Sequence, residues 1–124
     1  MSQDIVADTL NMMMNAKRAK KTIVETPKHS KLLMSVLAIA KLKGYVKDYK
    51  IKDDILRIEL GIINGCRAIK PRYTVNVDQI EKYAKRYLPA KNLGVLIVST
   101  SQGLMTHQTA IEKEIGGCLI AYLY

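Results

Sequence analysis

The hydrophobic positions at the beginning of the chain change period several times, and each change predicts a new element. Apolar residues recur every three to four positions over residues 4–16, which predicts an amphipathic helix. A short run rich in β-branched residues at 22–26 predicts a strand, because Pro27 follows it directly. A second helical pattern begins after Ser30, a side chain suited to capping a helix, and stops near Gly44.

A period of two follows, as is typical of half-buried strands. Residues 45–51 and 55–60 predict two antiparallel strands, and residues 52–54 predict the turn between them. The order helix, strand, helix, strand, strand predicts an α/β lobe over residues 1–62. Helices cannot cover both faces of so small a sheet, so we expect one open face, available to another lobe or a partner.

Residues 61–65 contain two glycines and an asparagine, which predict a boundary between two lobes. The alternating pattern beyond them, within residues 66–77, indicates an extended segment. We expect Asp78 to cap a short helix over residues 79–86, and Pro89 to end it.

The last part of the chain is organised around one polar stretch. The apolar run 94–98 leads into the loop Ser99-Thr100-Ser101-Gln102-Gly103, and a short helix capped by Thr106 follows. The apolar run 116–124 predicts the final strand. Residues 66–124 are therefore expected to form a second small lobe, mainly β with short helices, which gives an α+β fold overall.

The composition adds a formal net charge of +9, spread over both halves of the chain. A domain this basic most often meets a polyanion, RNA or DNA before a membrane surface, although a merely solvated surface is the alternative. No apolar run approaches the ~20 residues of a membrane span, and no signal peptide is expected. Cys66 and Cys118 form no C-x-x-C motif, so we expect reduced, buried thiols in a cytoplasmic protein, without metal or cofactor.

Basic residues gather in three groups, within residues 17–31, 67–72 and 82–91. We interpret them as contacts to phosphates, and Tyr83 and Tyr87 in the third group as faces for an unpaired base. The alternative for any single residue is a solvated helix face. The candidate RNA-binding side chains in these groups are Lys17, Lys20, Lys21, Lys28, Lys31, Arg72, Lys82, Lys85 and Arg86.

The polar loop is the other candidate site, through Ser99, Thr100, Ser101 and Gly103. Its hydroxyls can bond a phosphate, a ribose 2′-hydroxyl or a base edge, and glycine lets the backbone approach a partner closely. The alternative is an ordinary turn between strands, whose hydroxyls satisfy nearby amides.

Catalytic motifs are missing from the sequence. No G-x-S-x-G elbow surrounds the loop serines, and no Walker-type phosphate loop occurs. Of the two histidines, His107 fits the first turn of the last helix, and nothing in the sequence orients it as a base. We therefore expect no enzymatic activity.

The run 94–106, followed by the glycine pair 116–117 and the closing strand, closely resembles the signature of ribosomal protein eight of the small subunit. Residues 4–10 resemble the first helix of that family, and the resemblance extends over essentially the whole chain. The stretch 87–90 and the ending 122–124 resemble the archaeal and eukaryotic branch, and the absence of extensions favours the archaeal type.

The resemblance implies a structural constituent of the small ribosomal subunit, located in the cytoplasm on the ribosome. The family fold has two α/β lobes, binds the central domain of small-subunit ribosomal RNA at an irregular helix with unpaired bases, and acts early in subunit assembly. Its partners would be this RNA and neighbouring small-subunit proteins, with the chain a monomer in the ribosome. The resemblance assigns the RNA core contact to Ser99, Thr100 and Ser101, and the backbone contact to residues 17–31.

The chain departs from the family pattern in three places. Ile5 replaces a common proline, Met12–Met14 replace basic residues of the first helix, and Cys118 replaces a polar residue after the glycine pair. The methionines weaken any claim of RNA contact by the first helix, and we assign no RNA contact to Cys118. The alternative function is a non-ribosomal RNA-binding module, or a protein-docking module that uses the open sheet face and the Met-rich helix.

Overall fold

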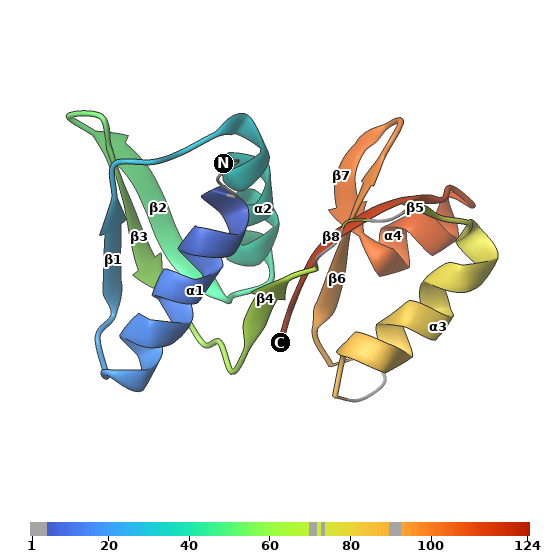
Figure 1. Cartoon of the computed structure of the whole chain (residues 1–124), viewed down its shortest axis with the longest axis horizontal. Helices are drawn as coiled ribbons and strands as arrows, with labels where there is room; N and C mark the ends of the chain where they lie inside the picture. The colour runs from blue at the N-terminus through green and yellow to red at the C-terminus, as the bar shows by residue number, and fades with distance from the viewer. Residues whose placement is uncertain (1–4, 70–71, 73, 90–92) are drawn as a thin grey trace. The chain divides into compact units, whose positions relative to one another are not determined.

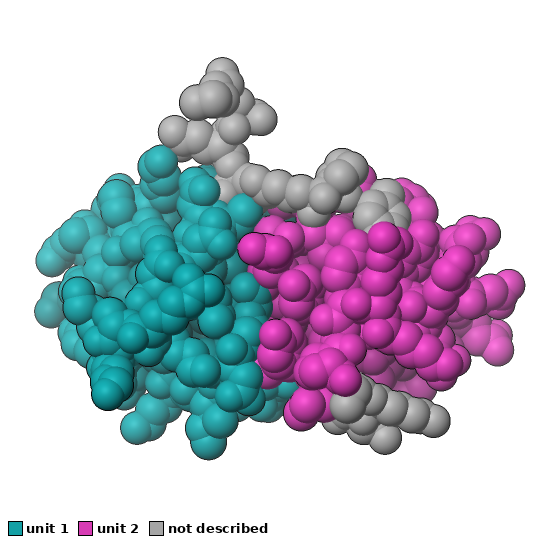
Figure 2. Space-filling model, turned by 60° about the horizontal axis from the view of Figure 1, so that its bottom comes forward, with its two compact units in different colours: residues 1–66 teal, residues 67–124 magenta. Residues whose placement is uncertain are grey.

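The computed structural model describes residues 5–69, 72, 74–89 and 93–124 (Figure 1). The chain divides into two compact units, residues 1–66 and 67–124 (Figure 2). Helices combine with antiparallel sheets, which confirms the predicted α+β class. No helix in the described part of the chain is both long and apolar enough to cross a membrane.

The first unit is a three-stranded antiparallel sheet covered by two helices, in the predicted order. The strands lie in the spatial order β1-β3-β2. Residues of β3 alternate, with Leu56 and Ile58 buried and Arg57 exposed. The elements are α1 (Ile5–Arg18), β1 (Ile23–Thr26), α2 (Lys31–Leu42), β2 (Val46–Lys52) and β3 (Ile55–Leu60).

Both helices lie on the same face of this sheet (Figure 1), and the opposite face carries exposed polar side chains, as expected for an open face. Leu33 and Leu37 of α2 and Leu10 of α1 are fully buried. Burial of such side chains contributes about 1.5–3 kcal/mol each, so this one-sided core holds the unit together.

Local signals fix the boundaries of these elements. The backbone N–H of Leu33 donates to Ser30 Oγ over 3.2 Å, which confirms the predicted cap. Gly44 has φ +86, a conformation that glycine adopts without strain. Asp53 and Asp54 have φ values of 53 and 62, so they form the two-residue turn that matches the twist of a hairpin.

The second unit contains a sheet in the order β4-β8-β6-β7, with β5 also paired to β8. The helices α3 and α4 pack on one face, where Ile80, Ala84 and Ala110 join Leu96 and Val98 in the core. The elements are β4 (Cys66–Ala68), β5 (Thr74–Val75), α3 (Val77–Tyr87), β6 (Val95–Thr100), β7 (Gly103–Thr106), α4 (His107–Glu112) and β8 (Gly117–Leu123).

One local expectation for this unit is wrong, and one strand was not predicted. The N-cap of α3 is Asn76 rather than Asp78, because the Gln79 side chain reaches back and accepts the Asn76 backbone N–H over 3.2 Å. Residues 103–106 are also a strand, β7, which no periodicity predicted. The loop at Ser99–Gly103 is therefore the turn of a β-hairpin.

Gly117 lets β8 pass close to the end of β6. A Cβ atom on Gly117 would collide with the backbone oxygen of Ser99 and would lie 2.8 Å from Val98 Cγ1. Gly116 is similarly confined, since a Cβ there would lie 2.5 Å from the Val75 oxygen. The glycine pair is thus required by space, and the position of Ser99 depends on it.

We expect Gly117→Ala to lower the free energy of unfolding by about 1–3 kcal/mol, because the added methyl group must displace the β6 backbone. Chemical denaturation measures the change. Ser101→Ala, at the exposed tip of the hairpin, serves as the control and should stay within about 0.5 kcal/mol of the original protein. A Gly117→Ala protein as stable as the control would contradict the close approach.

The two cysteines should differ in reactivity. Burial raises the pKa of the Cys66 thiol to about 12. Cys118 is only half-buried, so the expectation of two buried thiols is wrong for this residue. Because the thiolate is the reactive species, iodoacetamide at mildly alkaline pH should modify Cys118 well before Cys66 in the native protein. Mass spectrometry of time points distinguishes the sites, and denaturant should abolish the difference. Equal rates in the native protein would show that Cys66 is not shielded.

Candidate nucleic-acid interface

The hydroxyl of Thr100 holds the turn between β6 and β7. Thr100 Oγ1 donates to the Gly103 carbonyl oxygen over 2.8 Å and accepts the Gln102 backbone N–H over 3.1 Å. Gly103 has a φ of +112°, a backbone conformation that residues with a side chain rarely adopt. Thr100 therefore uses its hydroxyl to close the turn, as the plain-turn alternative requires.

The two serines are placed differently. Ser101 is exposed at the tip of the hairpin, and half-buried Ser99 pairs with Leu104 on one side and Cys118 on the other. Among the described residues, neither serine hydroxyl forms a hydrogen bond within the chain. Every buried side-chain oxygen or nitrogen atom in the described part of the chain has a hydrogen-bond partner, so the Ser99 hydroxyl is accessible rather than buried and unpaired. Both hydroxyls can therefore bond a partner from outside the chain.

The hydrogen bonds of the two histidines are structural, and neither is formed with a loop serine. His107 begins α4, as expected, and is buried, with its Nδ1 accepting the Leu96 backbone N–H over 3.1 Å. His29 Nε2 lies 3.2 Å from Asp54 Oδ1 in the first unit. In the described residues, no group of His, Cys, Asp and Glu is arranged to hold a metal ion.

The first basic group is divided in the structure. Lys17 lies in the last turn of α1, near Lys20 and Lys21 in the loop to β1, whereas Lys28 lies in the loop from β1 to α2 and Lys31 is the first residue of α2. These two loops lie at opposite ends of the first unit (Figure 1), so residues 17–31 form two basic patches rather than one. All five lysines are exposed.

The patch at Lys28 and Lys31 coincides with the N-terminus of α2. The first turn of this helix has no acidic residue, and Lys31 occupies its first position. A cation there opposes the helix dipole, which slightly destabilises the helix. The positive end of the helix dipole and a lysine at one point together favour a bound anion.

Helix α3 separates its charges along its length. Lys82, Lys85 and Arg86 are exposed and follow helical spacing on one side of its C-terminal half. The opposite end is acidic. Val77, Asp78 and Glu81 line a shallow depression there, together with Ile111 and Glu114.

The tyrosines of α3 are half-buried against the core of the second unit. Tyr87 stacks on Tyr122 with ring centroids 5.3 Å apart, and Tyr122 stacks on Tyr124 at 6.2 Å. One face of the Tyr87 ring is therefore occupied within the protein, and stacking of Tyr83 or Tyr87 on a base stays a prediction.

The remaining basic candidate of the second unit, Arg72, is exposed. Arg67 of the second group is exposed in β4. Lys70 of the second group and Lys91 of the third lie outside the described residues.

The surface proposed for the protein-docking alternative is not apolar. Met13 is completely buried in the first unit and Met14 is half-buried, so only Met12 of the Met-rich helix is exposed, at 36%. The open sheet face carries Lys50, Arg57 and other charged side chains. The sequence did not single out these cations, because they alternate with acidic and apolar residues along β2 and β3.

Comparison with known proteins supplies the remaining information. The ribosomal protein S8 family profile matches residues 4–124. The small ribosomal subunit protein uS8 of the archaeon Nanoarchaeum equitans is 45% identical over 129 aligned positions, which cover 100% of both chains. This archaeal relative agrees with the archaeal type expected from the sequence. The chain therefore belongs to the ribosomal protein S8 family.

Proposed function

We propose that this protein binds the central domain of small-subunit ribosomal RNA directly, at an irregular helix with unpaired bases, and that this binding supports subunit assembly. As a member of the ribosomal protein S8 family, the chain is a structural protein of the small ribosomal subunit. Neighbouring small-subunit proteins would be its other partners. The finer proposal rests on one observation, the division of roles among the hydroxyls of the β6–β7 turn.

Discrimination would come from this turn. The Thr100 hydroxyl closes the turn through its two backbone hydrogen bonds. Ser101 is therefore exposed on a backbone whose conformation Thr100 holds. A prepositioned hydroxyl loses little conformational entropy on binding, so it favours an RNA whose groups already match it. The contact would be lost on a regular duplex, which lacks the splayed bases and irregular backbone.

Affinity would come from the exposed cations. Each phosphate that a lysine or arginine neutralises releases counterions, and this sequence-independent gain falls as salt increases. The candidates are Lys17, Lys20 and Lys21 at one end of the first unit, Lys28 and Lys31 at the α2 N-terminus, and Arg72, Lys82, Lys85 and Arg86 in the second unit.

Ser101→Ala should weaken binding to the cognate RNA about fivefold, which corresponds to a hydrogen bond of about 1 kcal/mol. Binding to a random duplex should not change. Filter binding or fluorescence anisotropy measures both affinities. Ser35→Ala is the matched control, because Ser35 is an exposed serine whose hydroxyl bonds its own helix backbone. Equal losses on cognate RNA and duplex would refute the reading role of Ser101.

Thr100 should behave as a positioning residue. Thr100→Ser keeps the hydroxyl and should preserve cognate binding, whereas Thr100→Ala should lower both cognate affinity and thermal stability. The comparison of Ser and Ala at this position separates loss of the turn from loss of the methyl group. If Thr100→Ala binds the cognate RNA normally, closure of the turn by this hydroxyl does not matter for recognition.

Replacing Lys20 and Lys21 together by Gln should reduce the slope of log affinity against log salt by about 1 to 2 units. Lys43→Gln with Lys113→Gln removes the same total charge at exposed positions outside the three groups and is the control. An unchanged slope in the Lys20 and Lys21 variant would place these side chains away from phosphates.

A further inference from the structure

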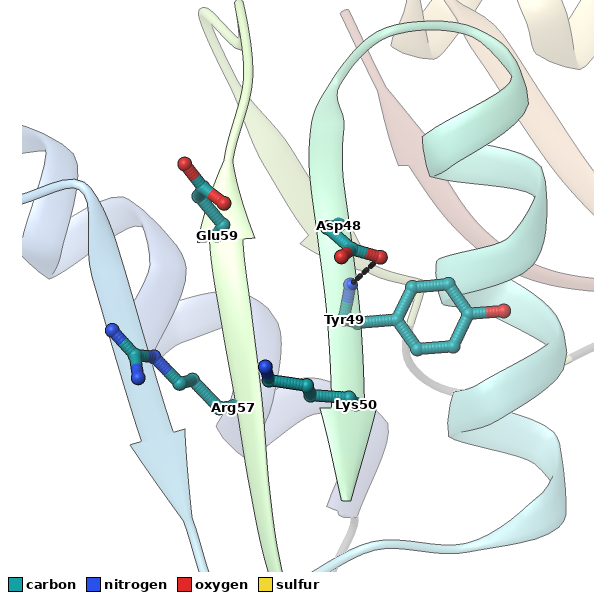
Figure 3. Close-up of a pocket in the computed structure, with 5 residues that line it drawn as sticks. All are labelled: Asp48, Tyr49, Lys50, Arg57 and Glu59. Atoms are coloured by element: carbon teal, nitrogen blue, oxygen red, sulfur yellow. Dashed lines mark hydrogen bonds between the residues drawn. The ribbon is translucent and has the colours of Figure 1, made fainter. Parts of the chain in front are cut away.

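The open face of the first unit carries two cations directly opposite each other. Lys50 of β2 and Arg57 of β3 are register partners, and both are exposed (Figure 3). Two like charges at paired positions on neighbouring strands repel each other and destabilise the sheet. The sheet therefore retains an electrostatic cost at this position, which an anion between the two side chains would remove.

Two carboxylates on this face, those of Asp48 and Glu59, each pair with another lysine. Asp48 Oδ1 accepts from Lys41 Nζ over 3.2 Å, and this hydrogen bond lowers the pKa of the Asp48 carboxyl. Glu59 Oε1 lies 3.7 Å from Lys47 Nζ. Within the part of the chain that the structure describes, no ion pair is recorded for Lys50 or Arg57.

The surface around the two cations is a shallow depression. Asp48, Tyr49, Lys50, Arg57 and Glu59 line it, and the ring of Tyr49 points toward α2 (Figure 3). One further cation, Lys52, follows Lys50 two positions along β2, and so lies on the same face. Glu25 of β1 is the register partner of Arg57 on its other side.

We propose that this open sheet face, centred on Lys50 and Arg57, binds the phosphate backbone of an RNA strand. The proposal deepens the proposed function, on which it rests, by adding a contact surface beyond the three basic groups. Arginine offers a planar donor fork that suits a phosphate oxygen pair, and lysine adds a point charge.

A backbone phosphate fits this face better than a protein surface. Cores of protein interfaces are depleted of charged residues and enriched in aromatic ones. The described outward positions here are mostly charged, and Ile55 is among the few apolar ones, with 41% of its surface exposed. A polyanion, in contrast, gains from each unpaired cation and needs no apolar area.

The test uses the full-length chain, small-subunit RNA and a salt titration. Lys50→Gln with Arg57→Gln should lower the slope of log affinity against log salt by about 1 to 2 units. The control pair Lys43→Gln and Lys113→Gln carries the same total charge and should change the slope less. Hydroxyl-radical footprinting should show one stretch of backbone protection lost in the first variant and retained in the control.

A second variant should act in the opposite direction. Glu25→Gln removes the carboxylate opposite Arg57, so RNA binding should become tighter and protection of the same backbone stretch stronger. Misfolding cannot produce this gain. Circular dichroism and thermal melting establish that the double variant remains folded.

The outcomes separate the two proposals. If the unaltered chain fails to bind small-subunit RNA, the proposed function itself is wrong. If it binds, but the Lys50 and Arg57 variant keeps the original slope and footprint, only the open-face contact is overturned. Equal losses in the variant and the charge-matched control would also overturn it, because net charge would then explain the effect.

Discussion

Strand β8 is the constraint on which the second unit depends. It pairs with β6 along one edge and with β4 and β5 along the other, so it joins segments that are distant in the sequence. The collision that a Cβ on Gly117 would make with the Ser99 backbone shows how closely β8 approaches β6. The β6–β7 turn therefore takes its position from a strand further along the chain, so its placement is a property of the whole sheet.

The elements of the first unit could be predicted because each one carries its own local signal. Ser30 supplies a cap, Gly44 a left-handed stop, and the change of period from helical to alternating marks the hairpin. The second unit has fewer such local sequence signals. Strand β7 is too short, between Gly103 and the Thr106 cap, for any period to appear. At the start of α3, several neighbouring residues could act as caps, and the reach of Gln79 decides in favour of Asn76.

The candidate site was visible as a set of residue types, whereas the roles within it required geometry. Three neighbouring hydroxyls look equivalent in a sequence, and only the pairing of Thr100 with Gly103 shows which one closes the turn. The open face was hidden for a related reason. Lys50 and Arg57 lie far enough apart in the sequence that only the register of β2 against β3 brings them opposite each other. Register depends on the turn at Asp53 and Asp54 as well as on the apolar pattern.

The charge separation along α3 has a kinetic consequence. Asp78 and Glu81 lie toward one end of the helix, and Lys85 and Arg86 toward the other, so α3 presents an oriented charge dipole to a large anion. Such a field acts over roughly a Debye length, about 8 Å at physiological salt, before any surfaces touch. The unit would turn its basic end toward a nucleic acid during diffusional encounter, which raises the fraction of collisions that lead to docking. The four side chains would thereby govern how fast the complex forms, as distinct from how long it lasts.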